Sequence, residues 1–369
     1  MKSVKVAVIG GGAAGVGVGV TLKHFGFDDY VVLEKDEIGS SFLQWPEEMR
    51  MITPSFQANQ FGIKDLNAVT LNTSPGFTLQ TEHPTGPQYA DYLKDVAAFH
   101  ELPVAEGVDI QEIEKKDGKF VLEASDEVVK ADYVIWACGE AQHPNKEAFP
   151  GARHCMHNIE ADSWKEFSEG RGEAFVIGGY ESGLDAAINL SRNGVEVTVI
   201  DGERPWARDH VDPSVSVSPY TMERFMQEAD NGRIELLKED VEEVRRTGDG
   251  YIVETECEEF ISDSRPVAAT GFKGSTSETD LFGHENGSPV LTEKDESTET
   301  EGLFLVGPEL KHGEAIFCFI YKFRKRFPVV VEEIARREGR DVEEAVEKYR
   351  EVGMYLDDLE ECCEDICRC

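Results

Sequence analysis

One pattern occurs twice in the chain and limits the folds open to it more than any other feature. Residues 4–34 read as an apolar strand, a glycine-rich turn, a helix and a second strand that ends in a carboxylate. Residues 174–201 repeat this order, with Gly178 standing 168 residues after Gly10. Strands alternating with helices predict parallel sheets covered by helices on both faces.

The similarity continues downstream of both copies. Residues 108–123 and 241–254 each predict two strands joined at an Asp-Gly turn. An apolar strand ending in a small residue and glycine follows each copy, and a third such strand, at 302–308, leads into apolar residues at helical spacing. We therefore predict an α/β fold with two Rossmann-like doubly wound domains, one inserted in the other, and a short cysteine-rich C-terminal tail.

The expected domain boundaries follow from where the two copies begin and end. The outer domain is expected at 1–143 and 290–336, the inserted domain at 144–289, and a helical segment with the cysteine-rich tail at 337–369. The acidic stretch 292–302 is expected to be a solvated loop that returns the chain to the outer domain.

The first glycine turn fits the G-x-G-x-x-G pattern of a dinucleotide site. Gly10 permits the tight turn, Gly12 lets the backbone approach a pyrophosphate, and Gly15 lets the helix pack on the strand. Glu34 ends the next strand, where a carboxylate can accept hydrogen bonds from ribose hydroxyls. The alternative is a glycine-rich turn used only for packing. The residues assigned to this site are Gly10, Gly12, Ala13, Ala14, Gly15, Glu34 and Lys35.

The second turn departs from the pattern at its centre. Gly178 and Gly183 hold the outer positions, but Tyr180 stands where the middle glycine is expected, and Gly179 is the candidate for the close approach. The repeat around this turn still favours a second dinucleotide site. The residues assigned to it are Gly178, Gly179, Tyr180, Glu181, Ser182 and Gly183.

The choice of nicotinamide coenzyme stays open at this point. Asp201 favours the 2′-hydroxyl of NADH, whereas Arg204 and Arg208 could hold the 2′-phosphate of NADPH.

The charge balance excludes several classes of partner. With 37 Lys and Arg against 73 Asp and Glu, the formal net charge is −36, which repels phosphate backbones and anionic lipids. We expect no nucleic acid and no membrane as partners. A halophilic source is the preferred interpretation, and an ordinary acidic cytosolic protein is the alternative. The chain shows no long apolar run and no signal-peptide pattern, so we expect it to be cytoplasmic.

The chain resembles the flavoproteins with two dinucleotide-binding domains: thioredoxin reductase, the flavin-containing monooxygenases and bacillithiol disulfide reductase. The matching motifs are GGGAAG followed by Glu34, VIWACG, GGYESG, AATG and GLFLVGP. The resemblance implies FAD in the outer domain and NAD(P)H in the inserted one. It also implies FAD contacts from Val108, Gly139, Gly307 and Pro308, although the family often carries an Asp where Pro308 stands. Residues 38–56 resemble the monooxygenase-like branch, and the flavin-side residues implied there are Trp45, Arg50, Thr53 and Ser55.

The departures from each subclass concern the catalytic elements. No C-x-x-C occurs in the chain, although thioredoxin reductases carry one. The resemblance to bacillithiol disulfide reductase implies a cysteine in the first turn, where this chain has Ala13 and Ala14. The monooxygenase fingerprint F-x-G-x-x-x-H is approached at 149–157 and not met, since Cys155 occupies the His position, with His154 and His157 as candidate activating neighbours.

The end of the chain concentrates thiols. Of eight cysteines, four lie in the last eight residues: Cys362, Cys363, Cys367 and Cys369. Three interpretations stay open: an arm that carries electrons from flavin to a disulfide, a site for a soft metal ion, or an acidic end without a role. His312 is a candidate proton donor or acceptor near the flavin, with a surface loop histidine as the alternative.

These observations predict an NAD(P)H-dependent FAD oxidoreductase that passes electrons to a disulfide or another small acceptor, with the C-terminal cysteines as one route. The first alternative is a flavin-containing monooxygenase that uses O₂, and the second is a flavoprotein that binds or traffics a soft metal. The expected partner is a small molecule, and the sequence makes no prediction about oligomeric state.

Overall fold

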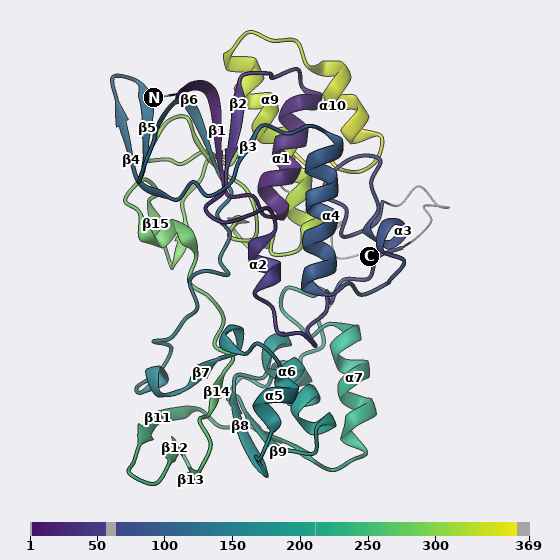
Figure 1. The fold of residues 1–369 in the computed structure, drawn as a ribbon, viewed down its shortest axis with the longest axis vertical. Helices are drawn as coiled ribbons and strands as arrows, with labels where there is room; N and C mark the ends of the chain where they lie inside the picture. Colours follow the sequence, from purple (N-terminus) through teal and green to yellow (C-terminus); the bar gives the residue numbers. More distant parts are fainter. Residues whose placement is uncertain (1, 57–63, 211, 360–369) are drawn as a thin grey trace. The chain divides into compact units, whose positions relative to one another are not determined.

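The structure is a computed structural model that describes residues 2–56, 64–210 and 212–359. The chain divides into two compact units. Unit 1 comprises Met1–Leu43, Thr53–Gln142 and Gly274–Cys369, and unit 2 comprises Gln44–Ile52 and His143–Lys273. Both units hold a sheet with parallel strands at its centre and helices packed on it, which confirms the predicted α/β class (Figure 1).

Unit 1 is built on a seven-stranded sheet in the order β3-β2-β1-β6-β5-β4, with β17 also pairing with β6. Its strands are β1 (Lys2–Ile9), β2 (Tyr30–Leu33), β3 (Val104–Ala105), β4 (Ile110–Lys116), β5 (Lys119–Ala124), β6 (Val128–Trp136) and β17 (Leu303–Leu305). The first half of β6 pairs antiparallel with β5, and its second half pairs parallel with β17. The carboxyl ends of β1, β6 and β17 therefore lie at one edge of the sheet.

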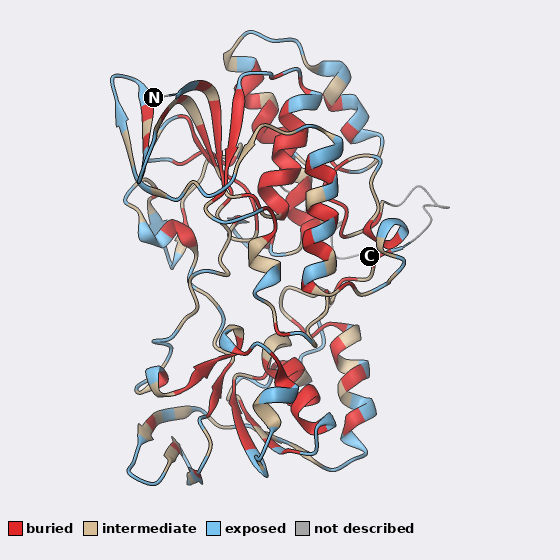
Figure 2. Ribbon diagram, in the orientation of Figure 1, coloured by how far each residue is buried: buried red, intermediate tan, exposed pale blue. Residues whose placement is uncertain are grey.

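Helix α1 (Ala13–His24) is the centre of this unit and is buried along its first ten residues (Figure 2). Its alternating glycines and valines allow this, because Gly17 leaves room for the ring of Phe327, which a Cβ atom there would overlap. The other helices of the unit are α2 (Ser40–Leu43), α3 (Pro75–Leu79), α4 (Gly86–Phe99), α8 (Ile320–Phe323), α9 (Phe327–Arg337) and α10 (Glu343–Arg350). Helix α1 packs against α4, α8 and α9.

Unit 2 holds a five-stranded parallel sheet in the order β10-β9-β8-β14-β7. Its strands are β7 (Met156–His157), β8 (Glu173–Ile177), β9 (Glu196–Ile200), β10 (Ile234–Leu237) and β14 (Val267–Ala268). Its helices are α5 (Trp164–Ser168), α6 (Glu181–Arg192) and α7 (Pro219–Ala229). Helix α6 packs on α5, α7, β8 and β9, and Val176, Leu190 and Val199 belong to the buried core that results.

Both predicted hairpins are present. Strands β4 and β5 meet at Asp117 and Gly118, whose positive φ angles of 52° and 78° are those of a tight hairpin turn. Strands β11 (Val241–Arg246), β12 (Tyr251–Thr255) and β13 (Glu259–Ser262) form the corresponding antiparallel sheet of unit 2.

Two segments belong to a different unit from the one that the sequence patterns predict. Residues 44–52 belong to unit 2, where Glu48 accepts hydrogen bonds from Ser163 Oγ at 2.7 Å and Trp164 N at 2.9 Å at the start of α5. Residues 274–289 belong to unit 1, where Glu309 binds the backbone at 275 and 276.

The acidic stretch 292–302 is not the solvated loop that its composition predicts. Asp295 is fully buried and Glu296 is 7% exposed, because each carboxylate is paired with an arginine from the helical segment that follows. Arg326 donates to both oxygens of Asp295 at 2.9 Å, and Arg337 donates to both oxygens of Glu296. Within the described ranges, no helix combines the length and apolar character needed to cross a bilayer.

Candidate active site

The first glycine turn has the tight geometry that its pattern predicts. Gly10 has a φ of +104°, and a Cβ atom placed on it would lie 2.5 Å from Ala137 O. A Cβ on Gly15 would overlap Gly10 O, so α1 can start this close to β1 only with glycine at this position.

The backbone at the start of α1 is open for an anion. Gly12 has an ordinary φ of −78°, and a Cβ there would meet only Ser41 Oγ, at 4.0 Å. No side chain caps the helix, and no acidic residue lies in its first turn. The first backbone N–H groups of a helix carry partial positive charge and bind phosphate well. The turn therefore fits a pyrophosphate.

Glu34 is held beside this turn in a fixed orientation. Its Oε2 accepts a hydrogen bond from Gly11 N at 2.5 Å, and its Oε1 accepts from Asp36 N at 2.9 Å. The side chain is 5% exposed, and the backbone O of Glu34 accepts from Val108 N at 2.9 Å. Of the other residues assigned here, Lys35 forms a long ion pair of 4.0 Å with Asp36. A carboxylate held this way can accept ribose hydroxyls, so the residues present fit the adenosine half of FAD.

The second turn repeats this construction in unit 2. Gly178 has a φ of +102°, and a Cβ on Gly183 would overlap Gly178 O. Asp201 Oδ2 accepts from Gly179 N at 2.7 Å, and its Oδ1 accepts from Glu203 N at 2.9 Å. In both units, therefore, the strand-end carboxylate accepts two backbone hydrogen bonds. One comes from the N–H of the second glycine of the turn, and the other from the N–H of the residue two positions after the carboxylate. This match between the two units was not visible in the sequence, because it depends on backbone hydrogen bonds.

The bulky residues of the second turn bind the segment that follows β9. The single O–H hydrogen of Tyr180 is shared between Pro213 O at 2.7 Å and Ser216 O at 2.9 Å. Glu181 accepts from Ser218 N and from Ser218 Oγ, the latter at 3.2 Å. These two side chains hold residues 213–218 against the start of α6, and the backbone of the turn keeps the form of the first one.

The end of β17 offers backbone groups beside the first turn, but Pro308 leaves it without a carboxylate. Gly307 has a φ of +111°, and a Cβ on it would lie 3.3 Å from the Cβ of Ala14, which places this strand end against the first turn. Pro308 offers no acid for a ribityl contact, and the next residue does not replace it. The carboxylate of Glu309 accepts four hydrogen bonds from the backbone and hydroxyl groups of Ser275 and Thr276. Gly139 has a φ of +64° and open space around its Cα.

Trp45 and Arg50 belong to unit 2, whereas the first turn belongs to unit 1. Arg50 donates to the backbone oxygens of Glu47 at 2.7 Å and Met49 at 2.9 Å. Their assignment to the flavin remains a prediction.

Three thiols of the described chain, those of Cys138, Cys155 and Cys257, are poorly suited to nucleophilic chemistry. Cys138 donates from Sγ to Ile9 O at 3.7 Å, and burial, followed by the charge of Glu309, raises the pKa of its thiol. Burial raises the pKa of Cys155 to about 12, and His157 points its ring to Gly271 O instead of this thiol. Burial therefore disfavours the thiolate of Cys155, and its activation by His154 or His157 stays a prediction. Cys257 lies in unit 2, where the charge of Glu239 raises its pKa.

His312 belongs to a buried charge cluster that the sequence did not reveal. It lies on β18 (Lys311–His312), which pairs with β19 (Ala315–Ile316), and its side chain is 12% exposed. Its Nε2 lies 2.6 Å from Asp295 Oδ1, and the fully buried Arg326 binds the same carboxylate. Because a carboxylate only accepts, Nε2 must donate, which leaves Nδ1 as the basic nitrogen of a neutral ring.

The four C-terminal cysteines assigned as catalytic, Cys362, Cys363, Cys367 and Cys369, lie outside the described residues. Within the part of the chain that the structure describes, no group of three His, Cys, Asp or Glu side chains is placed to hold a metal ion.

Glu140 is buried near the first turn, and this burial leads to a testable prediction about stability. Burial, and after it the charge of Glu309, raises the pKa of Glu140 from 4.5 to about 7. The folded protein therefore holds this proton where the unfolded chain releases it, and stability falls as the pH rises from about 4.5 to about 7. We expect Glu140→Gln to raise the free energy of unfolding near pH 8 by on the order of 2 kcal/mol, with no difference below about pH 4.

Urea denaturation at both pH values measures this effect. Glu147→Gln is the matched control, since Glu147 is exposed and pairs with Lys273 at 2.7 Å, and it should shift the midpoint little. A Glu140→Gln variant that is less stable than the parent near pH 8 would contradict the assignment.

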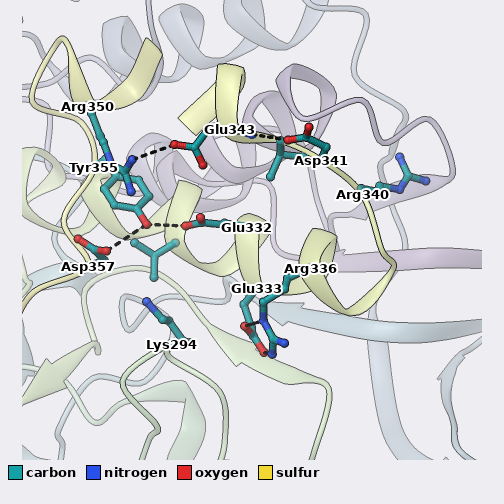
Figure 3. Close-up of a pocket in the computed structure, with 12 residues that line it drawn as sticks. Lys294, Glu332, Glu333, Arg336, Arg340, Asp341, Glu343, Arg350, Tyr355 and Asp357 are labelled. Carbon is teal, nitrogen blue, oxygen red and sulfur yellow. Dashed lines mark hydrogen bonds and ion pairs between the residues drawn. The ribbon is translucent and has the colours of Figure 1, made fainter. Parts of the chain in front are cut away.

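A separate cavity of about 410 Å³ lies in unit 1 beside α9 and α10 (Figure 3). Its lining is mostly charged, and the charges pair within it: Tyr355 OH donates to Glu332, and Arg350 lies 3.6 Å from Glu343. None of its lining residues belongs to the first turn, so we assign it no part in binding dinucleotide.

Comparison with known proteins agrees with this geometry. The fold places the protein in the class of FAD- and NAD(P)-dependent oxidoreductases built from two Rossmann-type units. A family model described as pyridine nucleotide-disulphide oxidoreductase matches residues 7–307. The chain belongs to this family, and it is an oxidoreductase that uses FAD and NAD(P)H.

Individual relatives span nearly the whole chain. The bacilliredoxin reductase Bdr of Bacillus subtilis is 26% identical over 352 residues, which cover 91% of this chain and 98% of that protein. The solved bacillithiol disulfide reductase Bdr of Staphylococcus aureus has a TM-score of 0.74 at 19% identity and covers 92% of this chain and 100% of its own. A flavin-containing monooxygenase from Stenotrophomonas maltophilia has a TM-score of 0.72 at 19% identity, covering 91% and 99%.

Proposed function

We propose that this protein reduces a small-molecule disulfide with electrons from a nicotinamide coenzyme, and that its C-terminal cysteines carry the electrons on the last step. The observation that carries the proposal is the pair of equivalent glycine turns, each with a strand-end carboxylate held by the second glycine N–H. The similarity to the B. subtilis bacilliredoxin reductase supports a disulfide as the acceptor.

In this proposal FAD is held by unit 1 and the coenzyme by unit 2. The N–H groups at the start of α1 bind the FAD pyrophosphate, Glu34 binds its ribose, and Gly307 lets β17 approach it. The N–H groups at the start of α6 and the carboxylate of Asp201 do the same for the coenzyme. When bound, FAD would supply the hydride and two-electron transfer chemistry that links the coenzyme to the acceptor. The disulfide then takes up two electrons and two protons and leaves as two thiols.

The described thiols leave the C-terminal route open. Cys138 and Cys155 are held as protonated thiols by burial, and Cys257 lies among carboxylates. No cysteine stands in the first turn, where Ala13 and Ala14 occupy the helix start. The remaining candidates are the exposed Cys318, just before α8, and the four thiols of residues 362–369.

His312 would supply a proton to the departing thiolate. Asp295 fixes its Nε2 as a donor, so in the protonated ring Nδ1 is the nitrogen that can release a proton.

The experiment replaces all four C-terminal cysteines by serine. We expect anaerobic flavin reduction by the coenzyme to be unchanged, because both turns lie outside the altered segment. Turnover with a disulfide such as bacillithiol disulfide should fall by at least about tenfold, since the thiolate is the attacking group in disulfide exchange. Stopped-flow absorbance of the flavin and release of thiol measure the two steps separately.

Cys318→Ser is the matched control for this experiment. The C-terminal route is overturned if Cys318→Ser abolishes disulfide turnover and the variant with four C-terminal serines retains it. If reduced flavin is reoxidised only when O₂ is admitted, the disulfide proposal fails and the monooxygenase alternative, supported by the S. maltophilia structure, takes its place.

We also propose that the protein works in the cytoplasm of an organism that lives in concentrated salt, on the basis of its net charge of −36.

A further inference from the structure

The short segment that leads into α7 lies against the second turn. Residues 213–218, which we call the strap, are bound to the start of α6, where the proposed function places the pyrophosphate of the coenzyme. We infer that the strap is a closed lid on the second turn, and that the coenzyme binds only after the strap leaves the start of α6. The inference rests on the proposed function, because it requires that unit 2 bind the coenzyme.

A comparison of the two turns shows what the strap covers. Gly12 and Tyr180 hold the same position in the two turns, and their backbones match, with φ and ψ of −78° and −166° at Gly12 and of −89° and −160° at Tyr180. Side chains at the two positions therefore leave the backbone in the same direction. At Gly12 this direction is open, since a Cβ there would meet only Ser41 Oγ, at 4.0 Å. The side chain of Tyr180 thus enters the space that the first turn leaves open for a pyrophosphate.

The hydroxyl of Tyr180 holds the strap in this place. Its single O–H hydrogen is shared between the backbone oxygens of Pro213, at 2.7 Å, and Ser216, at 2.9 Å. The glycine of the first turn has no side chain to make such a bond. The closed strap is therefore a feature of the second turn that follows from one substitution in the glycine pattern.

Glu181 holds the end of the strap that joins α7. Its carboxylate accepts hydrogen bonds from Ser218 N and from Thr221 Oγ1, the latter at 2.6 Å. The corresponding residue of the first turn is Ala13, and no acidic residue lies in the first turn of α1. A carboxylate beside the start of a helix repels a phosphate there, so Glu181 and a pyrophosphate compete for the same helix end.

Trp206 also lies on the turn, but it belongs to the fixed part of unit 2. A Cβ on Gly179 would lie 2.2 Å from the indole ring of Trp206, so the ring lies directly on this glycine. Trp206 packs against the buried core around the sheet. The strap is tied to the turn through side-chain hydrogen bonds, which can break and form again without moving the sheet, so we assign the opening movement to the strap.

Hydrogen exchange followed by mass spectrometry tests the closed strap without any coenzyme. Tyr180→Phe keeps the ring and removes the shared O–H, and one such hydrogen bond changes an equilibrium about fivefold. We expect the peptide that contains Ser216 and Ser218 to exchange about fivefold faster in this variant, with no change in β8. Tyr251→Phe is the matched control, because Tyr251 lies on β12 in the antiparallel sheet of unit 2. Equal exchange of the strap in the parent and in Tyr180→Phe overturns the inference.

Anaerobic stopped-flow reduction of the flavin-loaded protein by NADH and by NADPH tests the link to the coenzyme. A ligand that binds only the open form binds more weakly in proportion as that form is rare. We therefore expect Tyr180→Phe to raise the second-order rate constant of flavin reduction about fivefold. Tyr180→Gly, which restores the glycine of the first turn, should raise it at least about tenfold, and Tyr251→Phe should leave it unchanged. A tyrosine that bound the coenzyme itself would give slower reduction in both Tyr180 variants.

The outcomes separate the inference from the proposed function. If a coenzyme reduces the parent, and Tyr180→Phe is reduced at the same rate or more slowly, the inference is overturned and the proposed function stands. If neither coenzyme reduces the flavin of the parent or of either Tyr180 variant, the proposed function itself has failed. Reduction of Tyr180→Gly by a coenzyme that leaves the parent oxidised supports the inference most directly. Tyr180→Phe decides the test if Tyr180→Gly does not fold.

Discussion

Gly12→Ala should give a folded protein that is purified without flavin. The structure has room for the methyl group, because a Cβ at Gly12 meets only Ser41 Oγ at 4.0 Å and the φ of −78° is ordinary for alanine. The same methyl group would stand over the N–H groups that receive the pyrophosphate. We expect the affinity for FAD to fall at least about a hundredfold, or about 2.8 kcal/mol.

Visible absorbance of the purified protein and titration with FAD measure this loss, and urea denaturation of the flavin-free forms tests the fold. Gly172→Ala is the matched control, since Gly172 has no atom within 4 Å of an added Cβ and no positive φ. A Gly12→Ala protein that retains the flavin content of the parent would show that the pyrophosphate does not bind here.

Asp295→Asn should cost about 3–5 kcal/mol of unfolding free energy, the range measured when one partner of a buried ion pair is removed. Asp295 and Arg326 are both fully buried, and the variant leaves the arginine charge without its counter-ion. Asparagine tolerates the positive φ of 63° at this position, so the effect reports charge and not backbone strain. The change in the urea midpoint at constant pH gives the measurement.

Glu301→Gln is the control within the same acidic stretch, because Glu301 is exposed and Lys115 binds its backbone oxygen, which the substitution leaves in place. The urea midpoint of Glu301→Gln should equal that of the parent protein. The double variant Asp295→Asn with Arg326→Gln should recover part of the loss, since no unpaired charge remains. An Asp295→Asn midpoint within error of the parent would mean that water reaches this cluster.

The parts of the fold that the sequence predicts are those set by local chemistry. The glycines at 10, 15, 178 and 183 must be glycine for steric reasons, so their spacing indicated both turns and the repeat. The Asp117-Gly118 hairpin follows from its two positive φ angles in the same way. These signals were sufficient for the fold class, the family and the cofactors.

The parts that the sequence could not predict depend on partners far along the chain. Asp295 and Glu296 look like solvated acids until Arg326 and Arg337 are placed beside them, 31 and 41 residues later. His312 likewise becomes an oriented base only through Asp295. Glu48 joins its segment to unit 2 through backbone N–H groups more than 100 residues away, which leave no pattern in the sequence.

Leu356, near the C-terminal end of the described chain, is bound to the turn that follows α8. Leu356 N donates to Lys325 O at 3.1 Å, and Arg326 donates to Leu356 O at 2.6 Å. The same guanidinium binds the Asp295 carboxylate, so one buried side chain joins the last described residues to the buried charges of the core.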